Sequence, residues 1–239
     1  MNRFLVVATL TILVFSSCNP FGRRVRGDGN VTVQNRAVEN FKAVQVGGAL
    51  DVYVSQDSGF SVRVEADENL QEFIEVYNDG NTLRVRQRNN TSLNPSRDIK
   101  VYVTAPEFSR LGASGASEIK GQNRITSGNA IVIDLSGASE IEAELRAPSV
   151  RVDMSGASTA ELSGETRDFD VEGSGSSNIK AMDLLTENAS IRVSGASDAK
   201  VYASVKLEVK ASGASSVRYK GNASVSSNSS GASSIKKVD

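Results

Sequence analysis

Apolar and polar residues alternate with a period of two through most of the chain, and in the second half the phrase Ser-Gly-Ala-Ser interrupts the alternation at regular intervals. A period of two is typical of a β-strand with one buried face, whereas a helix has a period of 3.6 residues. The seven copies of the phrase, one of which reads Ser-Gly-Ser-Ser, begin at Ser114, Ser136, Ser155, Ser174, Ser194, Ser212 and Ser230. By subtraction, successive copies start 22, 19, 19, 20, 18 and 18 residues apart, which predicts a stacked repeat architecture.

Alignment on the first serine separates inward from outward positions. The third residue before that serine is mostly apolar: Leu111, Ile133, Val152, Val171, Ile191, Val209 and Ser227. The second residue before it is mostly polar or charged: Gly112, Asp134, Asp153, Glu172, Arg192, Lys210 and Asn228. Apolar residues return at the second position after the phrase: Ile119, Ile141, Ala160, Ile179, Ala199, Val217 and Ile235. Each repeat therefore predicts two short strands, one on either side of the phrase.

The phrase itself predicts a tight corner between those strands. Its glycine allows backbone angles that other residues resist, and its small side chains allow successive corners to stack at the strand spacing of about 4.8 Å. The sequence thus predicts an all-β fold, a single-stranded parallel β-helix with about 18–22 residues per turn. In the last copy Ser227 and Ser229 replace core residues and Lys236-Lys237 follow, as expected where a solenoid ends without an adhesive edge.

The same alternation, with larger residues, runs through residues 41–103. We interpret residues 37–239 as one β-helical body, with irregular first turns over 37–110 and regular repeats over 111–239. A helical turn is predicted over 69–75 and a loop over 88–98.

The N-terminus has the pattern of an export signal. Residues 1–17 contain Arg3 and an apolar run and end in small residues before Cys18, the one cysteine of the chain. This arrangement resembles a bacterial lipobox and predicts cleavage and lipid attachment at Cys18; the alternative is an ordinary signal peptide with a chance cysteine. Residues 18–36 then predict a flexible tether that carries the tripeptide Arg26-Gly27-Asp28, which some host receptors recognise.

The composition of the chain argues against several classes of function. The chain has 27 basic and 28 acidic residues, without the basic excess that nucleic-acid binding usually requires. It has no histidine, which removes histidine-dependent triads and the usual zinc sites, and we expect no cofactor. The Ser-x-x-Lys spacing that some acyl-transferases use occurs at Ser117/Lys120, Ser177/Lys180, Ser197/Lys200 and Ser233/Lys236, but it spans a predicted strand rather than a helical turn.

Two carboxylates are the best candidates for chemistry. Asp134 and Asp153 fall in the same outward column one turn apart, where they could bind a cation or act as acid and base in a polysaccharide enzyme. The simpler interpretation is a solvated strand face, because Glu172, Arg192 and Lys210 continue the column. For a sugar-binding surface, the candidate aromatic residues are Tyr53, Tyr77, Tyr102, Tyr202 and Tyr219.

Several motifs resemble one known family. Gly27–Val31, Arg36–Phe41, Val46–Val54, Glu65–Leu70 and the Ser-Gly-Ala-Ser array are similar to the head GIN domain family, whose members are described as putative autotransporter adhesins and are common in Bacteroidota. The likeness covers about residues 27–239. It implies a β-helical, exported and often lipid-anchored protein, and it explains Arg26-Gly27-Asp28 as a family glycine segment that follows an arginine.

From these observations we expect a non-catalytic lipoprotein of the cell envelope that presents its β-helical surface to a glycan or protein ligand. Its expected location is the outer membrane, on the cell surface or the periplasmic face, held by the lipid on Cys18. An oligomeric scaffold and a polysaccharide-acting enzyme are the alternatives.

Overall fold

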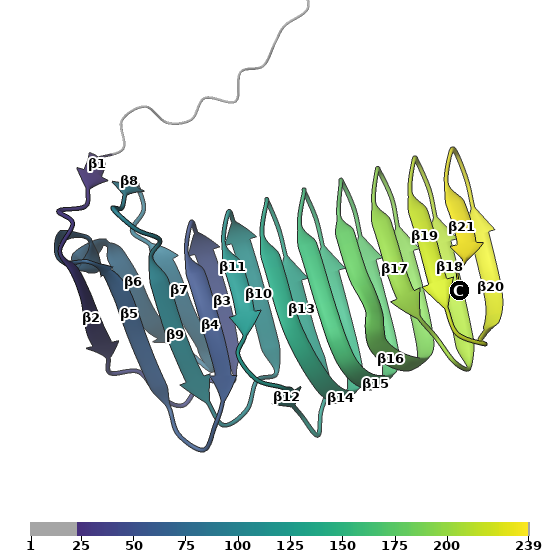
Figure 1. Ribbon diagram of the computed structural model, residues 1–239, viewed down its shortest axis with the longest axis horizontal. Coiled ribbons are helices and arrows are strands. Elements are labelled where there is room, and N and C mark those ends of the chain that lie inside the picture. Colours follow the sequence, from purple (N-terminus) through teal and green to yellow (C-terminus); the bar gives the residue numbers. More distant parts are fainter. Residues whose placement is uncertain (1–22, 239) are drawn as a thin grey trace, which may run out of the picture.

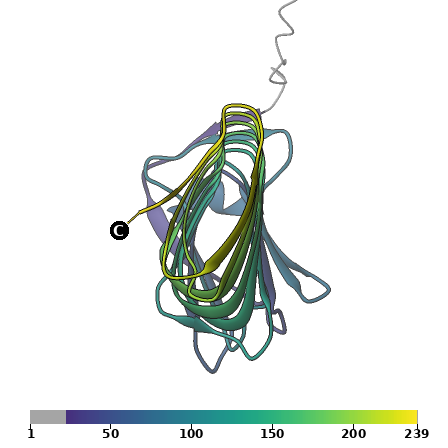
Figure 2. The same ribbon diagram turned by 90° about the vertical axis from the view of Figure 1, so that its right-hand side faces the viewer.

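The segments predicted as strands form two sheets that face each other across a narrow apolar core, and the chain winds from one sheet to the other and back in each turn. The computed structural model describes residues 23–238, so the predicted signal peptide and Cys18 lie outside it. Figure 1 shows the stack of coils from the side, and Figure 2 shows from its end that the coils superimpose as a flattened tube. The predicted parallel β-helix is confirmed. No helix within residues 23–238 has the length and hydropathy of a membrane-spanning segment.

The regular coils follow one another along the stack. We call the strands that precede each corner the first sheet and those that follow it the second sheet. The strands from the first regular coil onward are β10 (Arg110–Gly115), β11 (Glu118–Gly121), β12 (Ile125–Thr126), β13 (Ile131–Leu135), β14 (Glu140–Met154), β15 (Thr159–Gly173), β16 (Asn178–Val193), β17 (Asp198–Tyr202), β18 (Lys206–Ala211), β19 (Ser216–Lys220), β20 (Ser224–Ser229) and β21 (Ser234–Lys237). The expectation of two short strands per repeat is wrong for β14, β15 and β16, each of which continues around the second bend from one sheet to the other.

The corners stack through their backbones. Gly156, for example, has φ +77°, and a Cβ atom placed on it would lie 2.5 Å from the carbonyl oxygen of Gly137 in the preceding corner. The next residue, Ala157, donates its N–H to that same carbonyl at 2.7 Å. Equivalent bonds of 2.7 to 2.8 Å join every successive pair of corners from Gly48 to Ala232. Only a residue without a side chain fits, because both the angle and the close approach exclude a Cβ atom.

The last serines of successive Ser-Gly-Ala-Ser phrases form a buried column that the sequence did not reveal. Ser117, Ser139, Ser158, Ser177, Ser197 and Ser215 are only 1% to 2% exposed. Each donates its hydroxyl to the main-chain carbonyl of the first serine in its own corner, at 2.7 to 3.0 Å. A buried hydroxyl is costly unless it is hydrogen-bonded, so these bonds both satisfy the serine and hold the shape of the corner.

The irregular first turns are built differently from the repeats. Their elements are β1 (Arg23–Arg26), β2 (Val31–Arg36), β3 (Ala43–Gly48), β4 (Asp51–Gln56), β5 (Ser61–Asp67), the 3₁₀ helix η1 (Glu68–Phe73), β6 (Ile74–Asp79), β7 (Thr82–Gln87), β8 (Thr91–Asn94) and β9 (Lys100–Ala105). β3 pairs with both β7 and β10, and β4 pairs with both β9 and β11. The coil of β3 and β4 therefore lies between the later coil of β7 and β9 and the first regular repeat.

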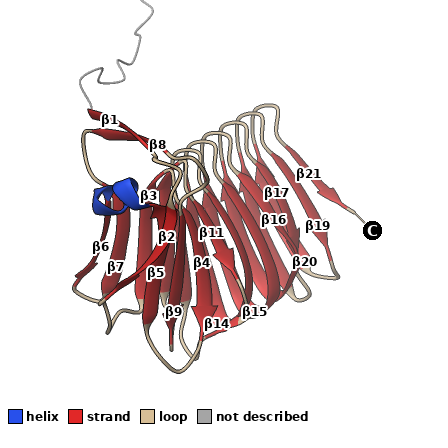
Figure 3. Cartoon of the chain, turned by 60° about the vertical axis from the view of Figure 1, so that its left-hand side comes forward, coloured by secondary structure: helices blue, strands red, loops and turns tan. Residues whose placement is uncertain are grey.

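Antiparallel strands close this end of the stack. β6 pairs with β7 in the first sheet, and β2 and β5 extend the second sheet beyond β9, all in antiparallel fashion. η1, the helical turn predicted over 69–75, lies at the same end, as Figure 3 shows. The prediction that residues 37–110 are parallel turns of the same stack is therefore only partly right, and the loop predicted over 88–98 contains β8.

The prediction of a flexible tether over residues 18–36 is wrong for residues 23–36. β1 pairs with β8 and β2 pairs with β5, so this segment is part of the folded end. Sequence reasoning missed it because the partners of both strands lie far away in the chain. Within it, Asn69 fixes Arg26-Gly27-Asp28: its amide donates to the Arg26 carbonyl at 2.8 Å and its oxygen accepts from the Asp28 N–H at 3.1 Å.

Asp67 is the buried centre of this end. Its carboxylate, 1% exposed, accepts hydrogen bonds from the Ser96 hydroxyl at 2.5 Å, the Ser96 N–H at 2.8 Å and the Gly29 N–H at 2.9 Å. A Cβ atom on Gly27 would lie 2.1 Å from the same carboxylate, which explains the glycine there. Burial by itself raises the pKa of Asp67, but the bonds from Ser96 and Gly29 outweigh it and hold the pKa below its ordinary value of 3.8.

A carboxylate whose pKa is lower in the folded than in the unfolded state stabilises the protein at neutral pH, and this contribution is lost as the pH falls through the folded pKa. Asp67→Asn should therefore lower the free energy of unfolding by about 1–3 kcal/mol at pH 7, because its amide cannot accept three bonds. Below about pH 4 the difference from the unmodified protein should shrink. Urea unfolding at several pH values measures both effects.

The control is Asp28→Asn, an exposed carboxylate in the same segment. It should change stability by less than about 0.5 kcal/mol. A loss for Asp67→Asn that stays constant from pH 7 to pH 3 would contradict the assigned role of the ionised Asp67.

Candidate functional site

The outward positions just before each corner form a long groove on the first sheet. One wall is the charged row Gln45, Asp134, Asp153, Glu172, Arg192, Lys210 and Asn228, and the other is the serine row Ser136, Ser155, Ser174, Ser194, Ser212 and Ser230. The floor is Leu135, Met154, Gly173, Val193 and Ala211. We call this groove, of about 690 Å³, the serine trough.

The shape of the trough follows from the path of the backbone as it enters each corner. The floor residues are the last inward residues before the chain turns, so the backbone dips between the outward charged row and the first serine. In-register pairing places Asp134 beside Asp153, Asp153 beside Glu172 and Glu172 beside Arg192, and the row continues through Lys210 to Asn228. Because the register is fixed by the stacked corners, each coil adds one residue to each wall, about every 4.8 Å along the groove.

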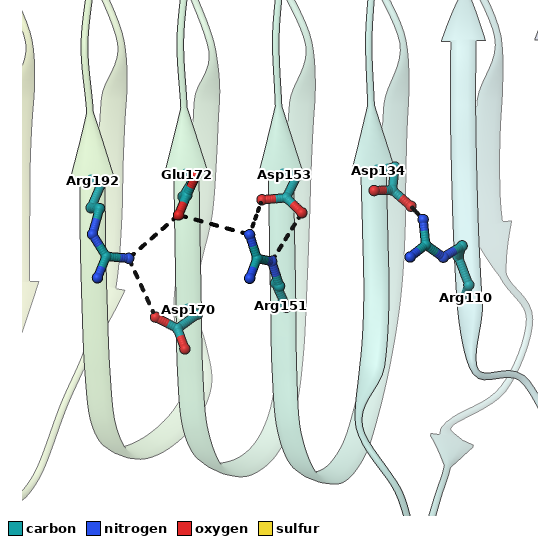
Figure 4. Close-up of polar contacts among 7 residues, drawn as sticks. All are labelled: Arg110, Asp134, Arg151, Asp153, Asp170, Glu172 and Arg192. Carbon is teal, nitrogen blue, oxygen red and sulfur yellow. Dashed lines mark hydrogen bonds and ion pairs between the residues drawn. The ribbon is translucent and has the colours of Figure 1, made fainter.

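The charge of the row changes along its length, from acidic at Asp134, Asp153 and Glu172 to basic at Arg192 and Lys210. Arginines on the first sheet neutralise the acidic part (Figure 4). Arg110 lies 2.7 Å from Asp134, and Arg151 lies 3.0 Å from Asp153 and 3.8 Å from Glu172. Arg192 adds contacts of 3.5 Å to Glu172 and 3.7 Å to Asp170. The acidic part of the row is thus an ion-pair network.

The predicted pair Asp134 and Asp153 does lie in adjacent coils. Burial, the largest effect, raises the pKa of Asp134; the neighbouring Arg110 opposes this and the Asp153 charge adds to it. Arg151, however, donates hydrogen bonds to both carboxylate oxygens of Asp153, at 3.0 and 3.2 Å, and so holds Asp153 in an ion pair. Within residues 23–238 no group of three or more acidic or cysteine side chains is placed to hold a metal ion.

The Ser-x-x-Lys spacings do not form catalytic pairs. Ser177 is buried and donates its hydroxyl to the carbonyl of Ser174, whereas Lys180 is exposed and pairs with Glu161 at 2.9 Å. The buried serine and the exposed lysine are thus kept apart.

The tyrosines do not gather into one platform. Tyr53 and Tyr102 stack on each other with ring centroids 5.3 Å apart, and the guanidinium of Arg63 lies 5.3 Å from the Tyr102 ring centre. Both faces of Tyr102 are therefore occupied by protein groups. Tyr77 lies under Arg86, and Tyr219 packs against the core. A sugar-stacking site at Tyr102 would require these contacts to open.

Comparison with known proteins identifies relatives of the whole body. The family model described as "Putative auto-transporter adhesin, head GIN domain" matches residues 40–223. No curated protein matches the chain.

Solved structures share the fold. A putative adhesin from Bacteroides fragilis superimposes with a TM-score of 0.83 at 19% identity, covering 90% of this chain and 100% of its own. A putative adhesin from Parabacteroides distasonis gives 0.74 at 20% identity, covering 90% of this chain and all of its own. A putative lipid binding protein from the same species gives 0.67 at 21%, covering 91% and 100%. At these identities the likeness shows the fold alone.

The ion-pair network predicts how the pKa of Asp134 changes when a neighbouring arginine is replaced. Arg110→Gln should raise the pKa of Asp134 further, because it removes both a favourable charge and a hydrogen bond from the ionised form. Arg151→Gln should raise it less, since Arg151 acts on Asp134 more weakly. Carboxyl NMR titration of the two variants measures the difference. Equal shifts, or none for Arg110→Gln, would contradict the network in Figure 4.

Proposed function

We propose that this chain, which belongs to the head GIN domain family of putative auto-transporter adhesins, is a non-catalytic binding protein of the cell envelope that holds a glycan or protein ligand along its serine trough. The family model supports an adhesin-like role, and the solved relatives share its fold. The observation that carries the proposal is the continuity of the trough, which is lined by successive coils from that of Asp134 and Ser136 to that of Asn228 and Ser230, with Gln45 at one end. Repeat proteins typically bind macromolecules on extended surfaces of this kind.

The chemistry of the trough suits an extended polar ligand. The serine row presents hydroxyls at regular intervals, and the charged row offers carboxylates at one end and cations at the other. An extended peptide or sugar chain laid along the axis could bond to several coils in turn, and many weak contacts would add to useful affinity. The ion-paired carboxylates of Asp134 and Asp153 favour binding over hydrolysis, since each is already engaged by an arginine.

Attachment to a membrane is the second part of the proposal. Lipid on Cys18 would place the membrane a few residues before β1, at the closed end of the stack. The C-terminal coils lie at the opposite end (Figure 1). The trough would then extend away from the membrane, which is the arrangement an exported binding protein requires.

A scaffold built by end-to-end stacking is less well supported. The last strands, β20 and β21, each pair on one side only and leave an edge for another chain. However, β20 is exposed along its whole length and has serines at inward positions, and β21 ends in Lys236 and Lys237. Lysines and small polar residues at a sheet edge oppose the addition of a second molecule.

Filling the trough should weaken ligand binding. The double variant Ser155→Phe with Ser194→Phe places two rings in the groove and should weaken saturable binding of the purified protein to its ligand on a glycan and matrix-protein array by about tenfold or more. The matched control is Thr159→Phe with Asn178→Phe, which adds the same rings to the second sheet and should leave binding unchanged.

Thermal unfolding of both variants checks that the fold is retained. Equal losses of binding in the two variants, or no saturable binding by the unmodified protein across the array, would contradict the proposed function.

A further inference from the structure

A second row of charges lies on the other side of the molecule, on the second sheet near the C-terminal end. Lys180 on β16 pairs in register with Lys200 on β17, Lys200 with Arg218 on β19, and Arg218 with Lys236 on β21. We call these four residues the basic ladder. Their side chains point outward from successive coils, about 4.8 Å apart along the axis.

The ladder has few acidic partners. Lys180 pairs with Glu161 at 2.9 Å and Arg218 with Asp198 at 3.4 Å. Lys200 and Lys236 make no ion pair with any side chain among residues 23–238. Residues 196–239 contain seven Lys and Arg against three Asp and Glu, a net charge of +4, whereas residues 111–195 contain seven against thirteen, a net charge of −6. Positive charge is thus concentrated at the end far from β1.

The fold does not require this row. Like charges directly opposite each other in neighbouring strands are destabilising. The adjacent outward row on the same strands carries Asn178, Asp198, Ser216 and Ser234, of which three are small and neutral, so this surface does not require positive charges. Four consecutive cations therefore lower stability slightly, and a ligand that neutralises them would offset that cost.

We propose that the basic ladder is a binding site for a linear acidic polysaccharide, whose carboxylate or sulfate groups pair with successive coils. Lysine offers a compact charge on a flexible stem, which suits acidic groups that are spaced along a polymer rather than held in one plane. Tyr202 lies two residues after Lys200 on the outward side of β17 and is half-buried, so its ring can contact a sugar beside the charged row.

The neighbouring charges set the length of this site. Glu161 and Glu142 continue the same row toward the middle of the stack, where they would repel an acidic chain. The ligand therefore engages the four cations and continues past the C-terminal end. A membrane surface fits less well, because the large exposed apolar residues, Val33, Tyr77, Leu185, Val205 and Val225, are not part of the ladder. Single-stranded nucleic acid fits less well too, since it usually stacks on several successive aromatic rings.

The test uses oligogalacturonate as the probe, with neutral dextran and an oligothymidylate for comparison, and measures binding to the purified protein by calorimetry. Oligogalacturonate should bind saturably and more weakly as salt increases. Lys200→Gln with Lys236→Gln should weaken binding by about tenfold, as expected for the loss of two charge contacts. Dextran should not bind.

The matched control is Arg167→Gln with Lys206→Gln, which removes the same charge from exposed positions outside both the basic ladder and the serine trough. It should change the affinity by less than about twofold. Equal losses in the two double variants, absence of oligogalacturonate binding, or equally tight binding of oligothymidylate would overturn the proposal. The trough variant Ser155→Phe with Ser194→Phe should retain oligogalacturonate binding, which separates this site from the proposed function of the trough.

Discussion

The structure depends on the close contact between one corner and the next. In each corner the residue after glycine donates to the carbonyl of the preceding glycine, and the glycine approaches that carbonyl so closely that no Cβ atom fits. This contact fixes the rise and the register of every coil. Once the register is fixed, Leu111 packs under Ile133, Ile133 under Val152 and so on, and small aliphatic side chains suffice to fill the core. The buried serines then hold each corner in shape.

The same constraint determines what the surface can do. Residues of one outward column lie directly beside each other, so a charged column becomes a continuous row and the dip before each corner becomes a continuous trough. The trough and the basic ladder occupy opposite sheets and differ in chemistry, one mixed in charge and rich in hydroxyls, the other cationic. Both surfaces favour long ligands that contact many coils. A catalytic site usually needs a deeper cleft built from loops of different lengths, which stacked identical corners do not provide.

Much of this fold could be predicted from the sequence, because the repeat makes local pattern and global fold agree. The inward column of Ile133, Val152 and Val171 and the corner glycines are where the pattern placed them. The closed end of the stack could not be predicted, because β2 pairs with β5 and β1 with β8 across long stretches of chain. Gly47–Leu50, whose backbone stacks on the first serine-containing corner, lacks the serine phrase. The acidic pair Asp134 and Asp153 was found from its column, but Arg110 and Arg151, which engage it, stand outside that column and were missed.

The most direct measurement of the central claim is the stability of Gly156→Val compared with Gly128→Val. Valine at 156 would have to adopt φ near +77° with its Cβ atom 2.5 Å from the Gly137 carbonyl oxygen, whereas Gly128 has no atom within 4 Å of an added Cβ. The account predicts that Gly156→Val lowers the free energy of unfolding by about 2–4 kcal/mol, through strain and overpacking, and that Gly128→Val changes it by less than about 1 kcal/mol. Equal stabilities of the two variants in urea unfolding would show that the stacked corners do not hold the structure together.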